Sequence, residues 1–338
     1  MAVTKAAIAI PDAILSYNVF QDEKMNQNLI SFLAILILVI VVALVVIHQL
    51  VSTAGEKMDQ VVDKVQGYID DIVHPGIVPF SNITYPEIPG DINELFETDN
   101  GIVTCTATIQ SAVNSYFDKD LYLPKEFKLR GRIYNYGLVL EHENYIIVTF
   151  RGSADSKDYA RDFQAFQETF FDLNGLAYKG LCHVGFKQVT LSIADLLVQL
   201  LHGVTKPVLI TGHSLGGCVA ILSAMYLAPV IPKQRYLVTF AAPRFGDLEF
   251  SESLYKVVNM RRQIASMSDF IPQFPLSVFG GYYNYLFGRG MELIDFQTGG
   301  LINNHSLLGY RATYEGTCQS GGKDPYTNMK WCLRKLDA

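Results

Sequence analysis

The chain has 338 residues, of which 49% are hydrophobic and 18% are charged, and its formal net charge is -6. This length and hydrophobic content suffice for a packed core in one large or two ordinary domains, which argues against a disordered chain. The acidic balance offers no basic surface to a polyphosphate, which argues against a nucleic-acid partner.

The first predicted element is a transmembrane helix, residues 28–51, which follows an N-terminal tail of residues 1–27. Its apolar run from Leu29 to Ile47 has Ser31 as its only polar side chain. These 19 residues would extend about 28 Å, close to the ~30 Å hydrocarbon thickness of a bilayer. A cleaved signal peptide is the main alternative, but its apolar core is usually shorter, about 7–15 residues. We therefore predict a single-pass membrane protein, with the side of the membrane undecided.

Residues 52–94 are predicted to form a juxtamembrane helix and a linker. Between residues 58 and 72, apolar residues recur at spacings of four and three, which is the a/d rhythm of a helix. A helix of this kind could associate with a second copy of the chain, or it could lie on a surface as an amphipathic helix. The sequence His74-Pro75-Gly76 would end it, and a proline-rich stretch follows as far as Gly90.

Residues 95–338 are predicted to form one α/β domain. Runs rich in β-branched and aromatic residues predict its strands, namely Arg132–Glu141, Tyr145–Phe150, Val208–Thr211, Tyr236–Phe240 and Lys256–Met260. The first two strands would form a hairpin. Helices are predicted at Val189–Leu201 and Leu215–Leu227. This alternation of strands and helices predicts a central sheet that is mostly parallel in its later part.

The stretch Gly212-His213-Ser214-Leu215-Gly216 fits the pattern G-x-S-x-G, between a predicted strand and a predicted helix. A serine at this position lies on a tight turn, where a side chain on either glycine would collide across the turn. The first N–H groups of the helix and its positive dipole end would face an oxyanion formed there. Ser214 is therefore the candidate nucleophile, with an ordinary glycine-rich turn as the alternative.

A serine nucleophile needs a histidine base and an orienting carboxylate, which follow the serine in the order acid, then histidine, in this class of fold. His305 is the only histidine after Ser214 in the sequence, so elimination indicates His305 as the base. Three aspartates lie between them, at Asp247, Asp269 and Asp295. Asp269 is preferred as the acid, because an apolar run breaks at this point, as expected of a loop at the end of a strand.

An oxyanion hole needs two N–H donors. Leu215, which follows the candidate nucleophile, would supply one of them. The second donor should come from a loop after an earlier strand. The predicted strand Tyr145–Phe150 runs into Arg151-Gly152-Ser153, so Ser153 is the candidate for the second donor. The alternative for Ser153 is a solvated serine in a turn.

Over residues 100–315, these motifs resemble those of the fungal-type (class 3) lipase family. The matching segments are Arg151-Gly152-Ser153 with Asp158, Tyr159 and Asp162, then His183-Val184-Gly185-Phe186, Thr211–Gly217, Pro243-Arg244-Phe245-Gly246 and Asp269–Pro272. The resemblance implies an α/β-hydrolase fold, a Ser214, Asp269 and His305 triad, and an oxyanion hole formed by the amides of Ser153 and Leu215. Asn304 departs from the pattern, since many members have aspartate before the histidine.

The resemblance also implies a lid after Ser153, here residues 154–171. Four aromatic residues in this segment recur at helical spacing, namely Tyr159, Phe163, Phe166 and Phe170. This spacing suits a lid helix with one apolar face, and it suits a buried helix equally well.

From these features we expect a membrane-anchored serine lipase or esterase that acts on the acyl esters of triacylglycerol or diacylglycerol. It would need neither a cofactor nor a metal ion, because the five cysteines have no metal-ligand spacing. Cys318 and Cys332 could pair in an oxidising compartment. The alternatives are a phospholipase A1, a non-catalytic lipase-fold scaffold that binds a partner, and, least favoured, a soluble peptidase or thioesterase.

Overall fold

The computed structural model describes residues 80–117, 120–153, 166–258, 260–275, 291–297, 303–317 and 331–333. All of them belong to one compact unit, His74–Ala338. Several predicted features lie outside the described residues. These are the N-terminal tail, the transmembrane helix, the juxtamembrane helix with its segment 58–72, and the Cys318–Cys332 pairing.

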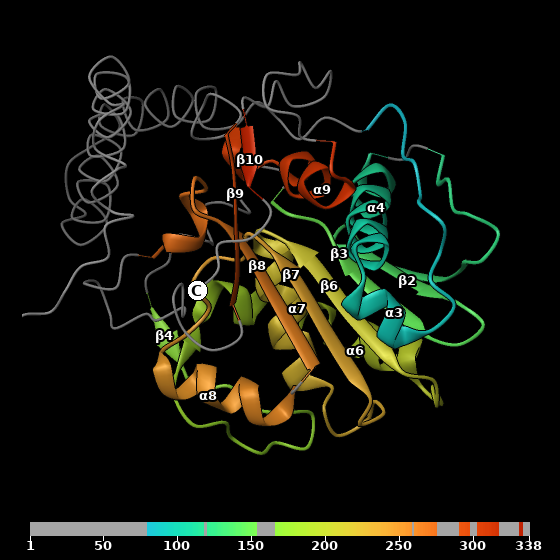
Figure 1. Ribbon diagram of the computed structural model, residues 1–338. Coiled ribbons are helices and arrows are strands. Elements are labelled where there is room, and N and C mark those ends of the chain that lie inside the picture. Colours follow the sequence, from blue (N-terminus) through green and yellow to red (C-terminus); the bar gives the residue numbers. More distant parts are fainter. Residues whose placement is uncertain are drawn as a thin grey trace, which may run out of the picture. The chain divides into compact units, whose positions relative to one another are not determined.

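The centre of the unit is an eight-stranded sheet with the strand order β1-β2-β3-β6-β7-β8-β9-β10 (Figure 1). Its strands are β1 (Lys128–Ile133), β2 (Gly137–Glu141), β3 (Ile146–Phe150), β6 (Val208–His213), β7 (Arg235–Phe240), β8 (Met260–Ser266), β9 (Met291–Gln297) and β10 (Trp331–Leu333). The pairs from β3 to β9 are parallel, whereas β1, β2 and β10 pair antiparallel. The predicted α/β class and mostly parallel sheet are confirmed.

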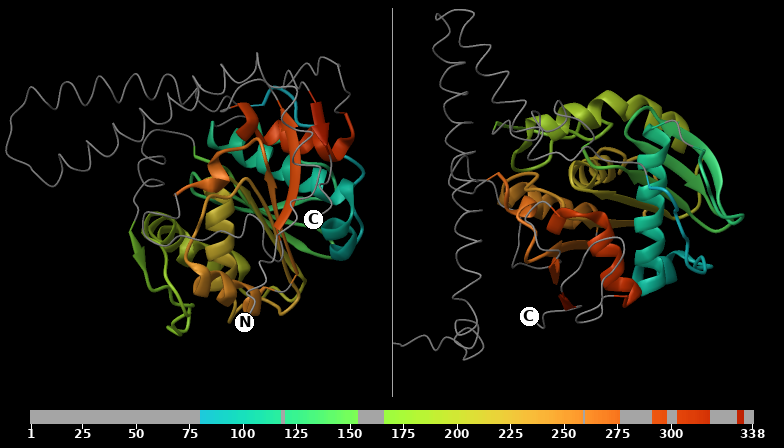
Figure 2. Two further views of the ribbon diagram at one scale, coloured as in Figure 1. Left: turned by 60° about the vertical axis from the view of Figure 1, so that its left-hand side comes forward. Right: turned by 90° about the horizontal axis from the view of Figure 1, so that it is seen from above.

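Helices cover both faces of the sheet. For example, α4 (Asp99–Tyr116) lies on one face and α6 (Val184–Leu201) on the other (Figure 2). The α-helices are α3 (Ile92–Glu97), α4 (Asp99–Tyr116), α6 (Val184–Leu201), α7 (Leu215–Tyr226), α8 (Leu248–Val257) and α9 (Leu307–Glu315). Among the described residues, the 3-10 turns η2 (Ile271–Gln273) and η3 (Asn303–His305) lie between α8 and α9 in the chain. A small second sheet pairs β4 (Gln167–Glu168) with β5 (Cys182–His183).

Strand β3 shows how the sequence fills two cores. Ile146, Val148 and Phe150 pack in the core formed with α6, α7 and α8. The intervening Ile147 packs in the opposite core, formed with α3, α4 and α9. Because alternate side chains of a strand point to opposite faces, a strand that is covered on both sides reads as a continuous apolar run. This accounts for the nearly continuous apolar sequence of β3, in which Thr149 is the one polar residue.

Among the described residues, α6 is the one helix that is long and apolar enough to cross a membrane by length and composition. Half of this helix is buried. Its residues Phe186, Ile193 and Leu197 pack in the core against the sheet, and the side chain of His183 caps its first turn. The apolar composition of α6 is therefore that of a core helix.

Two predicted strands have different bounds in the structure. The run Arg132–Glu141 is divided into β1 and β2 by a turn in which Tyr134 has a positive φ of 42°. The run Lys256–Met260 is not a strand, because α8 continues to Val257 and β8 begins at Met260. Asp247 starts α8 by accepting a hydrogen bond from the Phe250 N–H, at 2.8 Å.

The compact fold begins before residue 95, where the domain was predicted to start. The backbone N–H of Phe80 donates to Asn114 of α4, at 2.8 Å. The guanidinium of Arg311 on α9 donates to the carbonyl oxygen of Thr84, at 2.7 Å. Residues 80–94, predicted to be part of a linker, therefore belong to the packed unit.

Candidate active site

The candidate residues lie at the carboxyl ends of neighbouring parallel strands. Ser153 follows β3, Ser214 follows β6, and Asp269 follows β8. Since β3, β6, β7 and β8 run parallel, their carboxyl ends meet at one edge of the sheet. Open α/β sheets bind their ligands at this edge. The topology therefore brings together residues that are more than one hundred positions apart in the chain.

Ser214 lies on a strained turn between β6 and α7. Its backbone has φ 56° and ψ -128°, which a residue with a side chain rarely adopts. A Cβ added to Gly212 would lie 2.1 Å from the carbonyl oxygen of Gly216, and one added to Gly216 would lie 2.2 Å from that of Arg151. Both glycines are thus required by close approach, as the motif predicted.

The turn Arg151-Gly152-Ser153 packs directly against the Ser214 turn. A Cβ added to Gly152 would lie 3.3 Å from the Cβ of Ser214. Arg151 is buried, donates from a guanidinium nitrogen to the carbonyl oxygen of Gly152 at 2.6 Å, and lies over the ring of Tyr116, 4.2 Å from its centroid. These contacts hold the backbone of the R-G-S turn, and with it the candidate donor Ser153, beside Ser214.

The side chains of Asp269 and His305 contact each other at the same edge. Nδ1 of His305 lies 2.8 Å from Oδ2 and 3.1 Å from Oδ1 of Asp269. The Asp269 side chain is fully buried, and the His305 side chain is 12% exposed. The Asp269 carboxylate also accepts the backbone N–H of Ile271, at 3.0 Å. A carboxylate in this position fixes the orientation and tautomer of an imidazole.

The other two candidate acids have different partners. Asp247 caps α8 and also accepts the backbone N–H of Leu181, at 3.0 Å. Asp295 lies within β9 and accepts the hydroxyl of Ser268, at 2.6 Å. Burial raises the pKa of Asp295, although the Ser268 hydrogen bond opposes this. Asp269 is the candidate whose carboxylate contacts His305, as the sequence-based preference expected.

The imidazole of His305 lies 4.7 Å from that of His213, the residue before Ser214. Within the described residues, Nε2 of His305 is buried and has no hydrogen-bond partner. Ser214 is 4% exposed, and its side chain makes no capping hydrogen bond to α7. A base and a nucleophile are often this loosely associated in the absence of substrate. Nε2 is the nitrogen that remains available to accept a proton.

His213 is a further residue of the site, and the sequence interpretation gave it no role. Its Nε2 lies 2.8 Å from the carbonyl oxygen of His305, and the two imidazole rings are 4.7 Å apart. Burial and the neighbouring His305 lower the pKa of His213 well below its ordinary value. A neutral His213 can donate from Nε2 to this carbonyl, which holds the backbone of His305 next to the Ser214 turn.

The predicted lid lies mostly outside the described residues, since residues 154–165 are among those not described. Its last part is described and is not helical. Phe166 precedes strand β4 and is exposed, whereas Phe170 is buried in the core. The helical spacing that linked these two aromatic residues was therefore misleading, because an extended segment turns them to different surroundings.

Comparisons with known proteins find sequence similarity to lipases. A family model described as Lipase (class 3) matches residues 147–279, from β3 past the Asp269 loop. The lipase of Rhizomucor miehei is 26% identical over 145 residues, which are 41% of this chain and 40% of that relative. The secreted mono- and diacylglycerol lipase 1 of Fusarium solani is 28% identical over 141 residues, 40% of each. The matches thus cover less than half the length of these two relatives.

Solved lipase structures align with the chain at lower identity. The native propeptide complex of Rhizomucor miehei lipase covers 60% of this chain and 68% of its own, with 21% identity and a TM-score of 0.42. The alignment with a triacylglycerol lipase whose catalytic centre is a serine protease triad covers 62% of this chain and 80% of that lipase, with 20% identity and a TM-score of 0.45. Residues 147–279 are thus similar to the lipase (class 3) family model, and about two fifths of the chain is similar to each of the two fungal relatives.

Proposed function

We propose that the chain is a serine lipase that hydrolyses acyl esters of glycerolipids through an acyl-enzyme intermediate. Ser214, His305 and Asp269 would form the triad, and the amides of Ser153 and Leu215 would form the oxyanion hole. One observation carries the proposal. Nδ1 of His305 is held by Asp269, while its Nε2 has no partner among the described residues and the imidazole lies beside the strained Ser214 turn.

The arrangement supports acyl transfer in two steps. In the first, Nε2 of His305 takes the proton of the Ser214 hydroxyl as its oxygen attacks the ester carbonyl, and the proton then passes to the leaving alcohol. In the second, a water molecule attacks the acyl-enzyme, and His305 again acts as base. Asp269 stabilises the imidazolium in both steps. The free acid leaves, and the Ser214 hydroxyl is restored.

The oxyanion would be stabilised from two directions. Leu215 is the first residue of α7, so its N–H has no acceptor within the helix and points with the positive helix end toward the Ser214 turn. Ser153 ends the R-G-S turn that packs on Ser214. Removal of one donor of such a hole typically costs about 3–4 kcal/mol of transition-state stabilisation. Two amide donors would therefore supply a large share of the rate enhancement.

Acyl glycerols are the proposed substrates, and the predicted anchor at residues 29–47 supports a lipid substrate. A tethered domain meets lipid esters at a high effective concentration, which compensates for weak intrinsic affinity. The names of the two curated relatives, a lipase and a mono- and diacylglycerol lipase, point in the same direction.

The proposed function is tested with a fluorophosphonate probe, which reacts covalently with an activated serine. We expect the wild-type chain to be labelled and Ser214→Ala to remain unlabelled, with hydrolysis of diacylglycerol lost in parallel. Ser223, buried in α7, serves as a matched control, because Ser223→Ala removes a hydroxyl from the same helix. An unlabelled wild type, or equal labelling of Ser214→Ala, would reject the hydrolase and favour the non-catalytic scaffold.

A further inference from the structure

Tyr310 belongs to α9, the helix that begins two residues after His305. Its side chain is fully buried. The ring makes edge contacts with Phe240 and Phe296, with centroids 6.1 Å and 5.0 Å away, and another with His213 at 6.2 Å. These contacts from β7, β9 and β6 restrict the ring to one orientation. The position of the Tyr310 hydroxyl is therefore set by the core of the domain.

The Tyr310 hydroxyl connects the candidate acid with the end of a strand. It donates to Oδ2 of Asp269 at 2.7 Å and accepts the backbone N–H of Ser266 at 2.9 Å. Ser266 is the last residue of β8, and Asp269 follows it by three positions. Oδ2 is also the oxygen nearest to Nδ1 of His305, at 2.8 Å. A single carboxylate oxygen thus receives both the phenol and the imidazole.

Burial, followed by the nearby Asp269 carboxylate, raises the pKa of Tyr310 well above its ordinary value. The phenol is therefore a constant donor at any pH at which a lipase works. A hydrogen bond to a carboxylate stabilises its negative charge. The negative charge of Oδ2 is therefore shared between the phenol and the imidazole.

We propose that Tyr310 is a positioning residue that holds Asp269 in register with His305 and takes up part of the negative charge that the Asp269 carboxylate presents to the imidazole. This inference rests on the proposed function, because it assumes that His305 acts as the base. Among the described residues, the other titratable groups near the pair are His213, whose ring is 4.7 Å from that of His305, and Asp295, which contacts Ser268 next to Asp269.

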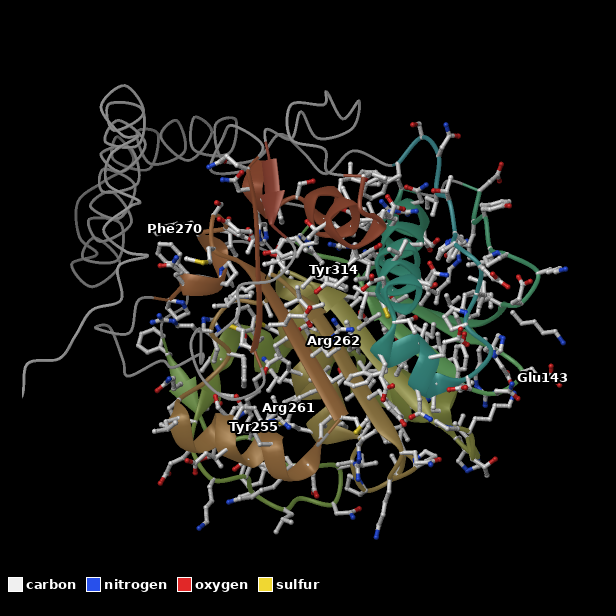
Figure 3. The ribbon with its side chains drawn as sticks, in the orientation of Figure 1. Glu143, Tyr255, Arg261, Arg262, Phe270 and Tyr314 are labelled. Carbon is white, nitrogen blue, oxygen red and sulfur yellow. The ribbon has the colours of Figure 1, made fainter. Side chains whose placement is uncertain are left out.

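The same helix provides a matched control. Tyr314, one turn after Tyr310, is also buried and donates its hydroxyl to a carboxylate, Oε1 of Glu292, at 2.5 Å. This carboxylate pairs with Arg262 at 2.6 Å, and the guanidinium carbon of Arg262 is 5.7 Å from the centre of the Tyr314 ring (Figure 3). Tyr314→Phe therefore removes an equivalent buried hydrogen bond that does not reach His305.

The test compares Tyr310→Phe with Tyr314→Phe in the full chain, with a water-soluble short-chain ester as substrate. We expect Tyr310→Phe to lower kcat about tenfold, the loss of one charge-assisted hydrogen bond, with KM unchanged. The acid limb of kcat/KM should move upward by about 0.5 pH unit, because Asp269 then holds the imidazolium more strongly. Tyr314→Phe should leave kcat and the acid limb unchanged, whatever it does to thermal stability.

A second variant keeps the Tyr310 hydroxyl in place and changes only its strength as a hydrogen-bond donor. Replacement of Tyr310 by 3-fluorotyrosine makes the phenol a stronger donor, so the acid limb should move downward. An unmoved acid limb in both Tyr310 variants of an active protein, or equal movement in Tyr314→Phe, would overturn the inference and leave the proposed function intact. A wild-type protein without esterase activity would overturn both.

Discussion

At the scale of single residues, two features of its surroundings determine the protonation state of His213. Its Nε2 lies 2.8 Å from the carbonyl oxygen of His305, a contact that needs a proton on Nε2. Its surroundings oppose a positive charge, since burial, and then the adjacent His305, lower the pKa of His213. The neutral form with Nε2–H satisfies both. The residue before the candidate nucleophile therefore links the Ser214 turn to the segment that carries His305, the candidate base.

This gives His213 a pH-dependent effect on stability. Unfolded His213 binds a proton below its ordinary pKa of about 6.5, whereas the folded residue resists protonation. The unfolded state therefore binds more protons, and the free energy of unfolding falls as the pH drops below that value, by up to about 1.4 kcal/mol per pH unit for one group. We expect urea unfolding of His213→Phe to show a smaller loss of stability between pH 7 and pH 5 than the wild type.

The His213→Phe variant keeps a ring against His305 and loses the donor. His213→Gln keeps an N–H donor and serves as the control for activity on a soluble ester, where it should retain more kcat than His213→Phe. A wild type and a His213→Phe variant with parallel pH dependence of unfolding would contradict this account of His213.

At the scale of elements, the segment that follows each strand determines whether an aspartate caps a helix or contacts His305. Asp247 begins α8 and accepts the N–H groups of Phe250 and Leu181. Asp269 lies in the loop after β8 and contacts His305. In sequence, both are aspartates in a turn at the end of an apolar run. Only the elements that follow, a helix in one case and a 3-10 turn in the other, separate a cap from a candidate catalytic acid.

Two substitutions should separate these roles. Asp247→Ala removes a helix cap, so we expect the free energy of unfolding to fall by about 1–2 kcal/mol, with kcat on a soluble ester unchanged. Asp269→Asn keeps the size of the side chain but favours the wrong tautomer of His305, so kcat should fall by orders of magnitude. Urea unfolding and steady-state kinetics of both variants test the assignment. A loss of kcat confined to Asp247→Ala would reverse it.

At the scale of the whole molecule, the compact unit and the predicted anchor have separate tasks. The described residues contain a complete sheet, both helical layers and the candidate site. Within that part of the chain, the helix apolar enough for a membrane is the core helix α6. If the predicted transmembrane helix and the proposed hydrolysis both hold, membrane attachment would depend on residues 28–51 and hydrolysis on the packed unit from residue 80 onward.

This separation predicts different effects on two substrates. Removal of residues 1–51 should leave kcat for a soluble ester within about twofold of that of the full chain, because the site would be intact. It should strongly reduce turnover of diacylglycerol in vesicles, since the high local concentration of substrate is lost. The full chain should stay in the membrane pellet after alkaline carbonate extraction, and the shortened chain should not. A full chain released by carbonate would refute the anchor.

The sequence by itself was sufficient for the short-range features. The turn around Ser214 was predictable because its glycines, strand and helix are adjacent in the chain. Helix α4 was not predicted from the sequence. It is rich in threonine, and its pattern of buried polar residues is typical neither of a strand nor of an amphipathic helix. The hydroxyls of Thr104, Thr106 and Thr108 donate to carbonyl oxygens three or four residues earlier, which allows them to be buried within the helix.

Contacts between distant residues were decided by the tertiary structure alone. His305 could be identified by elimination and Asp269 could be preferred as the acid, but the 2.8 Å contact between the two side chains exists only in the folded chain. The role of Tyr310 could not be read from the sequence, because a buried tyrosine in a helix has no distinguishing pattern. The physical reason is that parallel strands bring their carboxyl ends together however far apart they lie in the chain. Local sequence determines each turn, and the sheet determines which turns meet.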